Sequence, residues 1–359
     1  MKSLFDPVTI GNLSLKNRII RSATHERAND ANGRFAPFLA PIYEGLAKGG
    51  VAAIVTGMMG AGHNSRLLPS TVDANGATAV PELRILGDLV HGYDCKLLVQ
   101  LSHCGQRSTV TVDDGPAWGP VAAVQASGKP VKAMTRADIA AVAEGFADAA
   151  ARCREAGVDG VELHGAHGYG LSQFLSPYFN KRTDEYGGDI AARARIVFEV
   201  HDAVRRKAGP EYPVWIKLNG TDLAEEGTTW EELLWLCKEL EKRGIDAVEC
   251  SGGIGEDARS KSAQFVKDEK DEGTFAPQAL KLAAALTIPV ISVCGYRTPS
   301  VINEWLNKGD IAAVSLCRPL LSEPDLVARW ASGDLAKSRC ISCNRCYTPE
   351  KGYGCQVYR

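Results

Sequence analysis

The sequence lacks any apolar run long enough to cross a membrane, and it lacks an excess of charge of either sign. Its 41 Lys and Arg residues against 43 Asp and Glu residues leave a formal net charge of −2, which gives no support for a nucleic-acid or membrane partner. The first seven residues lack the apolar core of a secretory signal peptide, so we expect a cytoplasmic protein.

A Gly-x-Gly-x-x-Gly motif after the first predicted strand is also missing, so a Rossmann dinucleotide site lacks its usual sign. Instead, eight short apolar runs alternate with helical patterns, as expected of strands that are buried on both faces. The chain therefore predicts an α/β fold, a (β/α)8 TIM barrel over residues 1–335, with an open doubly wound sheet as the alternative. The first predicted strand is a short apolar one that follows a basic turn within 14–23, and the others are 51–56, 96–101, 158–163, 214–218, 247–250, 290–293 and 311–316.

Two polar stretches, 104–134 and 252–275, interrupt this alternation and are predicted to be loop excursions over the barrel mouth. The last predicted helix spans 322–330. A cysteine-rich tail follows the barrel over residues 336–359.

The pattern His164-x-x-His167-x-Tyr169 directly follows the fourth predicted strand. In a barrel of this kind, residues just past the C-terminal ends of the strands face the active-site mouth. Two imidazoles and a phenol there can bind an oxygen and deliver a proton. The alternative is that they are ordinary loop and core residues, but three neighbouring glycines favour a site.

Other predicted strands end in residues that suit a flat, phosphorylated ligand. Lys217 lies within an apolar strand, where its charge is costly unless it meets an anion, and Arg318 follows the last strand, where barrels often bind phosphate. With the amide of Gln100 they describe a pocket for FMN. Taken singly, Arg318 would be interpreted first as part of a surface ion pair, and the alternative for Lys217 is a side chain that reaches solvent. The candidate FMN-binding residues are Ser22, Ala23, Thr24, Gly57, Gln100, Lys217, Gly253, Gly295, Cys317 and Arg318.

Several longer motifs resemble the old yellow enzyme family of FMN-dependent NAD(P)H:flavin oxidoreductases. They are Leu15-Lys-Asn-Arg18, Gln100-Leu-Ser-His-Cys-Gly-Gln106, His164-Gly-Ala-His-Gly-Tyr169, Phe174-Leu-Ser-Pro177 and Asn180-Lys-Arg-Thr-Asp-Glu-Tyr-Gly-Gly188. The resemblance covers roughly residues 1 to 335 and is close to the barrel domains of 2,4-dienoyl-CoA reductase and trimethylamine dehydrogenase.

The resemblance implies that FMN takes hydride from NAD(P)H and passes it to the activated C=C bond of an unsaturated carbonyl compound or enoyl thioester. His164 and His167 would then bind the carbonyl oxygen, and Tyr169 would donate the proton. Lys217, which stands where many relatives have arginine, would lie near the N1/C2 side of the flavin. His25 resembles a histidine of dienoyl-CoA reductases, which implies a modulator or proton relay; the alternative is a supporting hydrogen bond.

The tail carries Cys340, Cys343, Cys346 and Cys355, a C-x2-C-x2-C-x8-C spacing that suits a 4Fe–4S cluster or zinc. An empty motif is the third reading of this spacing, with the cluster favoured. The other seven cysteines show no metal-like spacing, so we expect most of them to be buried as small apolar residues: Cys95, Cys104, Cys153, Cys237, Cys250, Cys294 and Cys317.

Three other functions are carried as alternatives. A metal-dependent barrel hydrolase would use His164, His167 and Glu162 as its polar centre. An FMN and iron–sulfur dehydrogenase would be fed by a separate electron partner, and a non-catalytic protein would dock a partner through its tail. The sequence leaves open the physiological substrate, the choice between NADH and NADPH, and a homo-oligomeric state.

Overall fold

The computed structural model describes residues 1–30, 32–256, 266–347 and 353–358. Eight parallel strands close into a barrel in the order β10-β11-β12-β13-β14-β3-β4-β6, because β6 also pairs with β10. These are β3 (Ile19–Arg21), β4 (Ala53–Val55), β6 (Lys96–Ser102), β10 (Gly160–Gly165), β11 (Val214–Asn219), β12 (Ala247–Ser251), β13 (Val290–Val293) and β14 (Ile311–Leu316). The closed ring confirms the predicted TIM barrel and excludes the open sheet.

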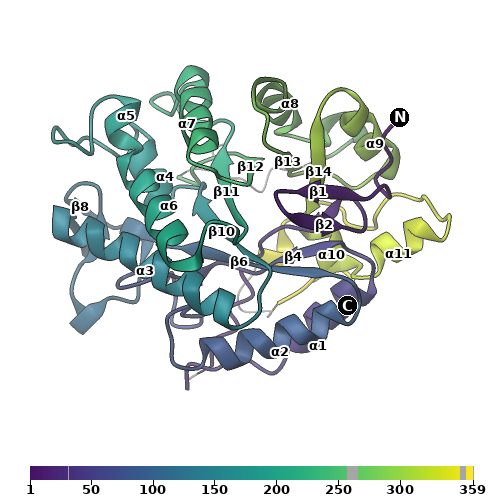
Figure 1. Ribbon diagram of the computed structural model, residues 1–359, viewed down its shortest axis with the longest axis horizontal. Helices are drawn as coiled ribbons and strands as arrows, with labels where there is room; N and C mark the ends of the chain where they lie inside the picture. Colours follow the sequence, from purple (N-terminus) through teal and green to yellow (C-terminus); the bar gives the residue numbers. More distant parts are fainter. Residues whose placement is uncertain (31, 257–265, 348–352, 359) are drawn as a thin grey trace.

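Helices surround this barrel, as Figure 1 shows. They are α1 (Leu39–Lys48), α2 (Ala79–His91), α3 (Arg136–Glu155), α6 (Arg195–Ala208), α7 (Trp230–Lys242), α8 (Ala276–Ala285) and α9 (Pro299–Asn307). Capping boxes at Thr135 and Thr229 begin α3 and α7, because each threonine hydroxyl accepts from the backbone N–H three residues on. None of the helices in the described part of the chain is both long and apolar enough to span a bilayer.

Side chains alternate along each barrel strand between an outer apolar face and an inner face. Leu97, Val99 and Leu101 of β6 join the core between strands and helices, whereas Leu98 joins a second, inner cluster. That inner cluster also holds Trp215 of β11 and, from the hairpin β1 (Val8–Ile10) and β2 (Leu13–Leu15), Ile10. The hairpin therefore closes the N-terminal end of the barrel with apolar side chains.

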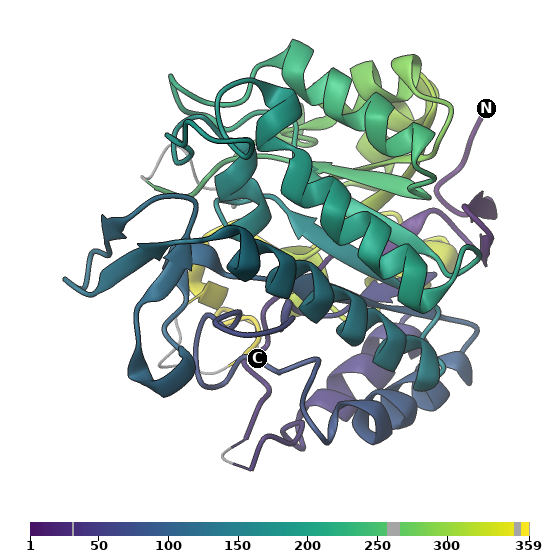
Figure 2. The same ribbon diagram turned by 60° about the vertical axis from the view of Figure 1, so that its left-hand side comes forward.

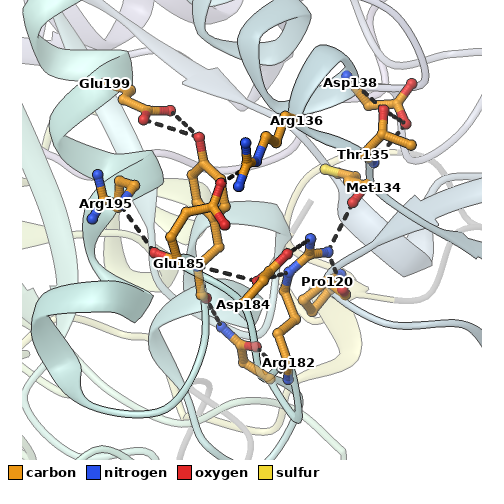
Figure 3. Close-up of polar contacts among 12 residues, drawn as sticks. Pro120, Met134, Thr135, Arg136, Asp138, Arg182, Asp184, Glu185, Arg195 and Glu199 are labelled. Atoms are coloured by element: carbon orange, nitrogen blue, oxygen red, sulfur yellow. Dashed lines mark hydrogen bonds and ion pairs between the residues drawn. The ribbon is translucent and has the colours of Figure 1, made fainter.

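The opposite end of the barrel carries the predicted excursion 104–134, which contains a small sheet of β7 (Ala117–Gly119), β8 (Ala123–Val124) and β9 (Pro130–Ala133). Figure 2 shows this sheet and the N-terminal hairpin on opposite sides of the molecule. Arg182 fastens the sheet to the barrel, because its guanidinium donates to the carbonyl oxygens of Pro120 and Met134 and pairs with Asp184 at 2.5 Å (Figure 3). The motif 180–188 is thus a structural brace beside the mouth.

The predicted helix 322–330 is wrong in its extent. The chain forms α10 (Arg318–Ser322), breaks, and resumes as α11 (Leu326–Ala331). Pro324 explains the break, since a proline disfavours helical geometry in the residue before it. The helix α4 (Gly170–Leu175), which directly follows Tyr169, and the short α5 (Ile190–Arg193) were not predicted separately.

Candidate active site

A cavity of about 170 Å³ opens at the C-terminal ends of the barrel strands. It gathers most of the residues that the sequence nominated, from strands far apart in the chain. The nominated residues that line it are Ser22, Ala23, Thr24, His25, Gln100, His164, His167, Tyr169, Lys217, Gly295, Cys317 and Arg318. The site therefore lies where a barrel of this type places its chemistry.

His164, His167 and Tyr169 form a compact trio on one wall of the cavity. The ring centroid of His164 lies 5.2 Å from that of His167 and 5.1 Å from that of Tyr169. Hydrogen bonds hold His167 in place: its backbone N–H donates to Asn219 Oδ1, and its Nε2 lies 2.7 Å from Ser251 Oγ. The buried Nδ1 of His164 has no hydrogen-bond partner among the described residues.

Burial decides the protonation of the trio. Burial, with the nearby charge of Lys217, lowers the pKa of His167 to about 3, and burial lowers the pKa of His164 well below its ordinary value. Burial raises the pKa of Tyr169 to about 12, although the guanidinium of Arg107, 5.5 Å from the phenol ring centroid, opposes the rise. Near pH 7 both imidazoles are neutral and the phenol keeps its proton.

His25 lines the same cavity, with its Nε2 3.0 Å from Thr71 Oγ1. Burial lowers the pKa of His25 to about 4, so this imidazole is also neutral near pH 7. The predicted supporting hydrogen bond is therefore present. The role of His25 as a modulator or proton relay stays a prediction.

The floor of the cavity is a buried cluster of charges. Lys217 Nζ lies 2.5 Å from Glu249 Oε2 and 3.3 Å from Glu162 Oε1, and it also donates to Ser22 Oγ. Burial disfavours the charge of Lys217, but Glu162 and Glu249 together hold its pKa above the ordinary value. Burial and the neighbouring Glu249 raise the pKa of Glu162 to about 8. The sequence predicted that Lys217 needs an anionic partner, and the carboxylate of Glu249 is the nearest one.

Gln100 joins this floor, because its Nε2 donates to Glu162 Oε1 at 2.7 Å. The contact follows from strand register, in which Glu162 of β10 is the partner of Gln100 on β6 and Glu249 of β12 is the partner of Lys217 on β11. Neither Glu162 nor Glu249 was predicted to belong to this floor. The inward positions of β10 and β12 were the signal that would have found them.

The far end of the cavity is built by the turns after β13 and β14. Gly295 has φ +89°, and an added Cβ there would lie 3.0 Å from Thr274 Oγ1, so a side chain would be both strained and crowded. Arg318 is buried at the start of α10, which contradicts the surface ion pair considered above. Arg297 also lines this end and was not nominated. Cys317 lies 3.1 Å, sulfur to oxygen, from Thr24 Oγ1.

Two nominated glycines do not line the cavity. Gly57 faces the buried ion pair of Arg21 and Glu26, and an added Cβ would lie 1.9 Å from Glu26 Oε2. Gly253 has φ +84° and donates its N–H to the carbonyl oxygen of Thr221. Both glycines therefore meet requirements of the protein backbone, and their predicted contact with FMN finds no support in the cavity.

The four tail cysteines line one small cavity together with Arg318 and Leu321. Within the described ranges, however, no three His, Cys, Asp or Glu side chains are grouped closely enough to hold a metal ion. The hydrolase hypothesis therefore lacks a ligand set, since Glu162 contacts Lys217 and Gln100 while His167 contacts Ser251. Among the other cysteines, five are buried as expected, whereas Cys294 and Cys317 are partly exposed and line the main cavity.

The chain matches the NADH:flavin oxidoreductase / NADH oxidase family over residues 3–336. It is 34% identical to an NADPH dehydrogenase of Geobacillus sp., with 89% of this chain and 91% of that protein covered. It is also 34% identical to a metal reductase of Desulforamulus reducens, with 96% of this chain but 51% of that protein covered. The chain thus spans about half the length of some of the curated relatives that it matches.

Solved structures show the same architecture. A 2-naphthoyl-CoA reductase in complex with 2-naphthoyl-CoA superposes with a TM-score of 0.87 at 26% identity, over 96% of this chain and 54% of that one. Morphinone reductase in complex with tetrahydroNAD gives a TM-score of 0.77 at 26% identity, over 93% and 92% of the two chains. With the family match over nearly all of the barrel, these likenesses establish that the chain belongs to the NADH:flavin oxidoreductase / NADH oxidase family.

Proposed function

We propose that this protein is an FMN-dependent oxidoreductase that takes hydride from NAD(P)H and reduces the activated C=C bond of an α,β-unsaturated carbonyl compound. The observation that carries the proposal is the convergence of His164, His167 and Tyr169 on a single buried cavity. The NADPH dehydrogenase relative and the morphinone reductase structure support the same class of reaction.

The residues present fit FMN. Gln100 and Lys217 offer polar groups at the floor, and Ser22, Ala23 and Thr24 form one side of the cavity. The backbone at Gly295 and the guanidinium of Arg318 suit the phosphate, because an arginine fork and exposed N–H groups are common phosphate ligands. When bound there, FMN supplies the carrier for hydride between NAD(P)H and the alkene.

His164 and His167 orient the substrate by donating N–H hydrogen bonds to its carbonyl oxygen. Neutral imidazoles can do this, and the low pKa values of both residues keep them neutral from pH 5 upward. Donors fixed in a buried site stabilise the negative charge that grows on that oxygen during reduction. Both histidines line the cavity, so each ring can present one N–H to that oxygen.

Tyr169 holds the proton that the substrate α-carbon receives. Its raised pKa keeps the phenol protonated across the working pH range, and the Arg107 guanidinium over its ring offsets part of the charge left after transfer. Arg107 Nη1 also donates to the carbonyl oxygen of His167 and thereby connects the acid to the oxygen-binding pair. An enone or enoyl thioester is the substrate class that this arrangement serves.

Purified protein should bind FMN and become yellow, then lose its colour with NADH or NADPH under nitrogen and regain it when an enone is added. The expected result follows from the fit of the cavity to FMN and from the acid and oxygen-binding groups beside it. Absorption spectroscopy through such a titration is the measurement. Protein that takes up no FMN when incubated with an excess would contradict the proposed function.

Replacing Tyr169 by Phe should slow reoxidation of the reduced enzyme by an enone roughly 100-fold or more, because the general acid is lost. Flavin reduction by NAD(P)H should change little, since that step needs no proton from Tyr169. Anaerobic stopped-flow absorbance separates the two steps.

Tyr296→Phe is the matched control for that variant, because Tyr296 is a second tyrosine that lines the same cavity, but its hydroxyl lies 2.7 Å from Ser292 Oγ. The control should retain both steps. Equal alkene reduction by the Tyr169→Phe variant and by the unaltered enzyme would remove Tyr169 from the acid role.

For the tail, we propose that Cys340, Cys343, Cys346 and Cys355 ligate a 4Fe–4S cluster, with zinc as the alternative metal. Their spacing and their shared cavity beside Arg318 support this. Among the described residues no three of the candidate ligands lie close enough together to hold a metal ion, so no step of the reaction is assigned to the cluster. A bound cluster would favour the alternative function, an FMN and iron–sulfur dehydrogenase that exchanges electrons with a separate partner.

Protein purified anaerobically should contain iron and acid-labile sulfide in equal amounts, and replacement of Cys343 by Ser should lower both. Replacement of buried Cys153, which is remote from the tail and lies in α3, should leave them unchanged. Elemental analysis and a sulfide assay make the measurement. Zinc without iron would replace the cluster by a zinc site, and neither metal would leave the motif empty.

A further inference from the structure

The cysteine-rich tail crosses the barrel mouth at the proposed phosphate end of the cavity. Ser338 N–H donates to the carbonyl oxygen of Arg297, and Arg297 Nη1 lies 3.4 Å from the carbonyl oxygen of Cys340. Cys340 and Ser342 line the same cavity as the histidine pair. The tail is therefore a wall of the proposed FMN site and not only an appendage that follows the barrel.

Ser342 is the tail residue that meets the phosphate arginine. Arg318 Nη1 donates to Ser342 Oγ at 2.7 Å and to Asn344 Oδ1 at 2.7 Å. The backbone N–H of Val266, from the excursion after β12, donates to the same hydroxyl oxygen at 3.2 Å. Three segments that are remote in sequence thus converge on one serine, of which only 1% is exposed.

The hydroxyl of Ser342 still has a hydrogen bond to give. A serine oxygen accepts through two lone pairs and donates one hydrogen. Here Arg318 and Val266 occupy the accepting side, and no acceptor for the hydrogen lies among the residues that the structure describes. Because Ser342 faces the cavity, an anionic oxygen bound there is the acceptor that this hydroxyl is arranged to meet.

The backbone around this serine is held in an unfavourable conformation. Ser342 has φ +58° and Asn344 has φ +60°, in the left-handed region that most residues avoid. Asparagine tolerates this region better than serine does, and glycine adopts it without strain. A serine kept at such a position points to a use for its hydroxyl.

We propose that Ser342 is a phosphate-binding residue of the FMN site and that Ser342 and Asn344 position the guanidinium of Arg318 toward the phosphate. The inference rests on the proposed function and deepens it, because it assigns part of the cofactor site to the tail. The competing explanation is purely structural, in which Arg318 anchors the tail and the serine has no contact with a ligand.

The test compares FMN with riboflavin, which carries the same ring but no phosphate. Dissociation constants for both are measured by flavin fluorescence on the full-length apoprotein of the unaltered chain and of Ser342→Ala and Ser342→Gly. Both variants should weaken FMN binding about 10-fold, because a hydrogen bond to a charged group is lost. Riboflavin binding should stay within about twofold, since the ring contacts are unchanged.

Ser342→Gly separates the proposal from an effect on folding. Both variants lose the same hydroxyl, but glycine relieves the positive φ, so the thermal midpoint of Ser342→Gly should exceed that of Ser342→Ala while both weaken FMN binding to a similar extent. Ser332→Ala, at the exposed end of α11, is the matched control and should change neither ligand.

FMN binding by either Ser342 variant within twofold of the unaltered protein, or equal weakening of FMN and riboflavin, would overturn the inference and leave the proposed function standing. Failure of the unaltered apoprotein to bind FMN would overturn both.

Discussion

The structure depends on one buried cation, Lys217, held between two carboxylates at the centre of the barrel. A lysine that is 2% exposed is stable only if its charge is compensated, and Glu162 and Glu249 provide this from the two adjacent strands. Removing Glu249, the nearer partner, would leave the buried charge of Lys217 without its closest counter-charge. Strand register consequently fixes the floor of the cavity. The side chains of His164, His167 and Tyr169 lie above this fixed floor.

This floor also sets the electrostatics of the wall above it. The imidazole of His164 is the register partner of Lys217 across β10 and β11, so protonation of the histidine would bring a second buried positive charge next to the first. Burial and this neighbour keep both histidines neutral, which makes them hydrogen-bond donors and not acids. The acid role is left to Tyr169, whose phenol is held by Arg107 from outside the floor. The buried charge of Lys217 and the neutral state of the two histidines therefore follow from the same packing of adjacent strands.

The barrel and the trio of His164, His167 and Tyr169 could be predicted from the sequence, because each depends on a local pattern. Apolar runs gave the strands, and the trio lies within six residues after one of them. Lys217 was also recognisable as a charge in need of an anion. The identity of that anion was not, because it depends on which strands are adjacent and on their register. The contact of Gly57 with FMN stays a prediction, and the proximity of this glycine to Glu26 could not be read from the sequence for the same reason.

The contact between Arg318 and Ser342 shows the same limit over a longer distance. Neither residue carries a local signal for the other, and only the path of the tail across the barrel mouth brings them together. From the sequence, the tail was predicted only as a cysteine-rich segment that follows the barrel. The structure makes it part of the cavity wall, so that one end of the proposed cofactor site is built from the last segment of the chain.

The most direct test of this account is a crystal structure of the protein with FMN bound. The account predicts a flavin ring lying over Lys217 and Gln100, facing His164, His167 and Tyr169, with Lys217 still between Glu162 and Glu249. Flavin bound elsewhere, or Lys217 withdrawn from both carboxylates to reach the ring, would contradict it.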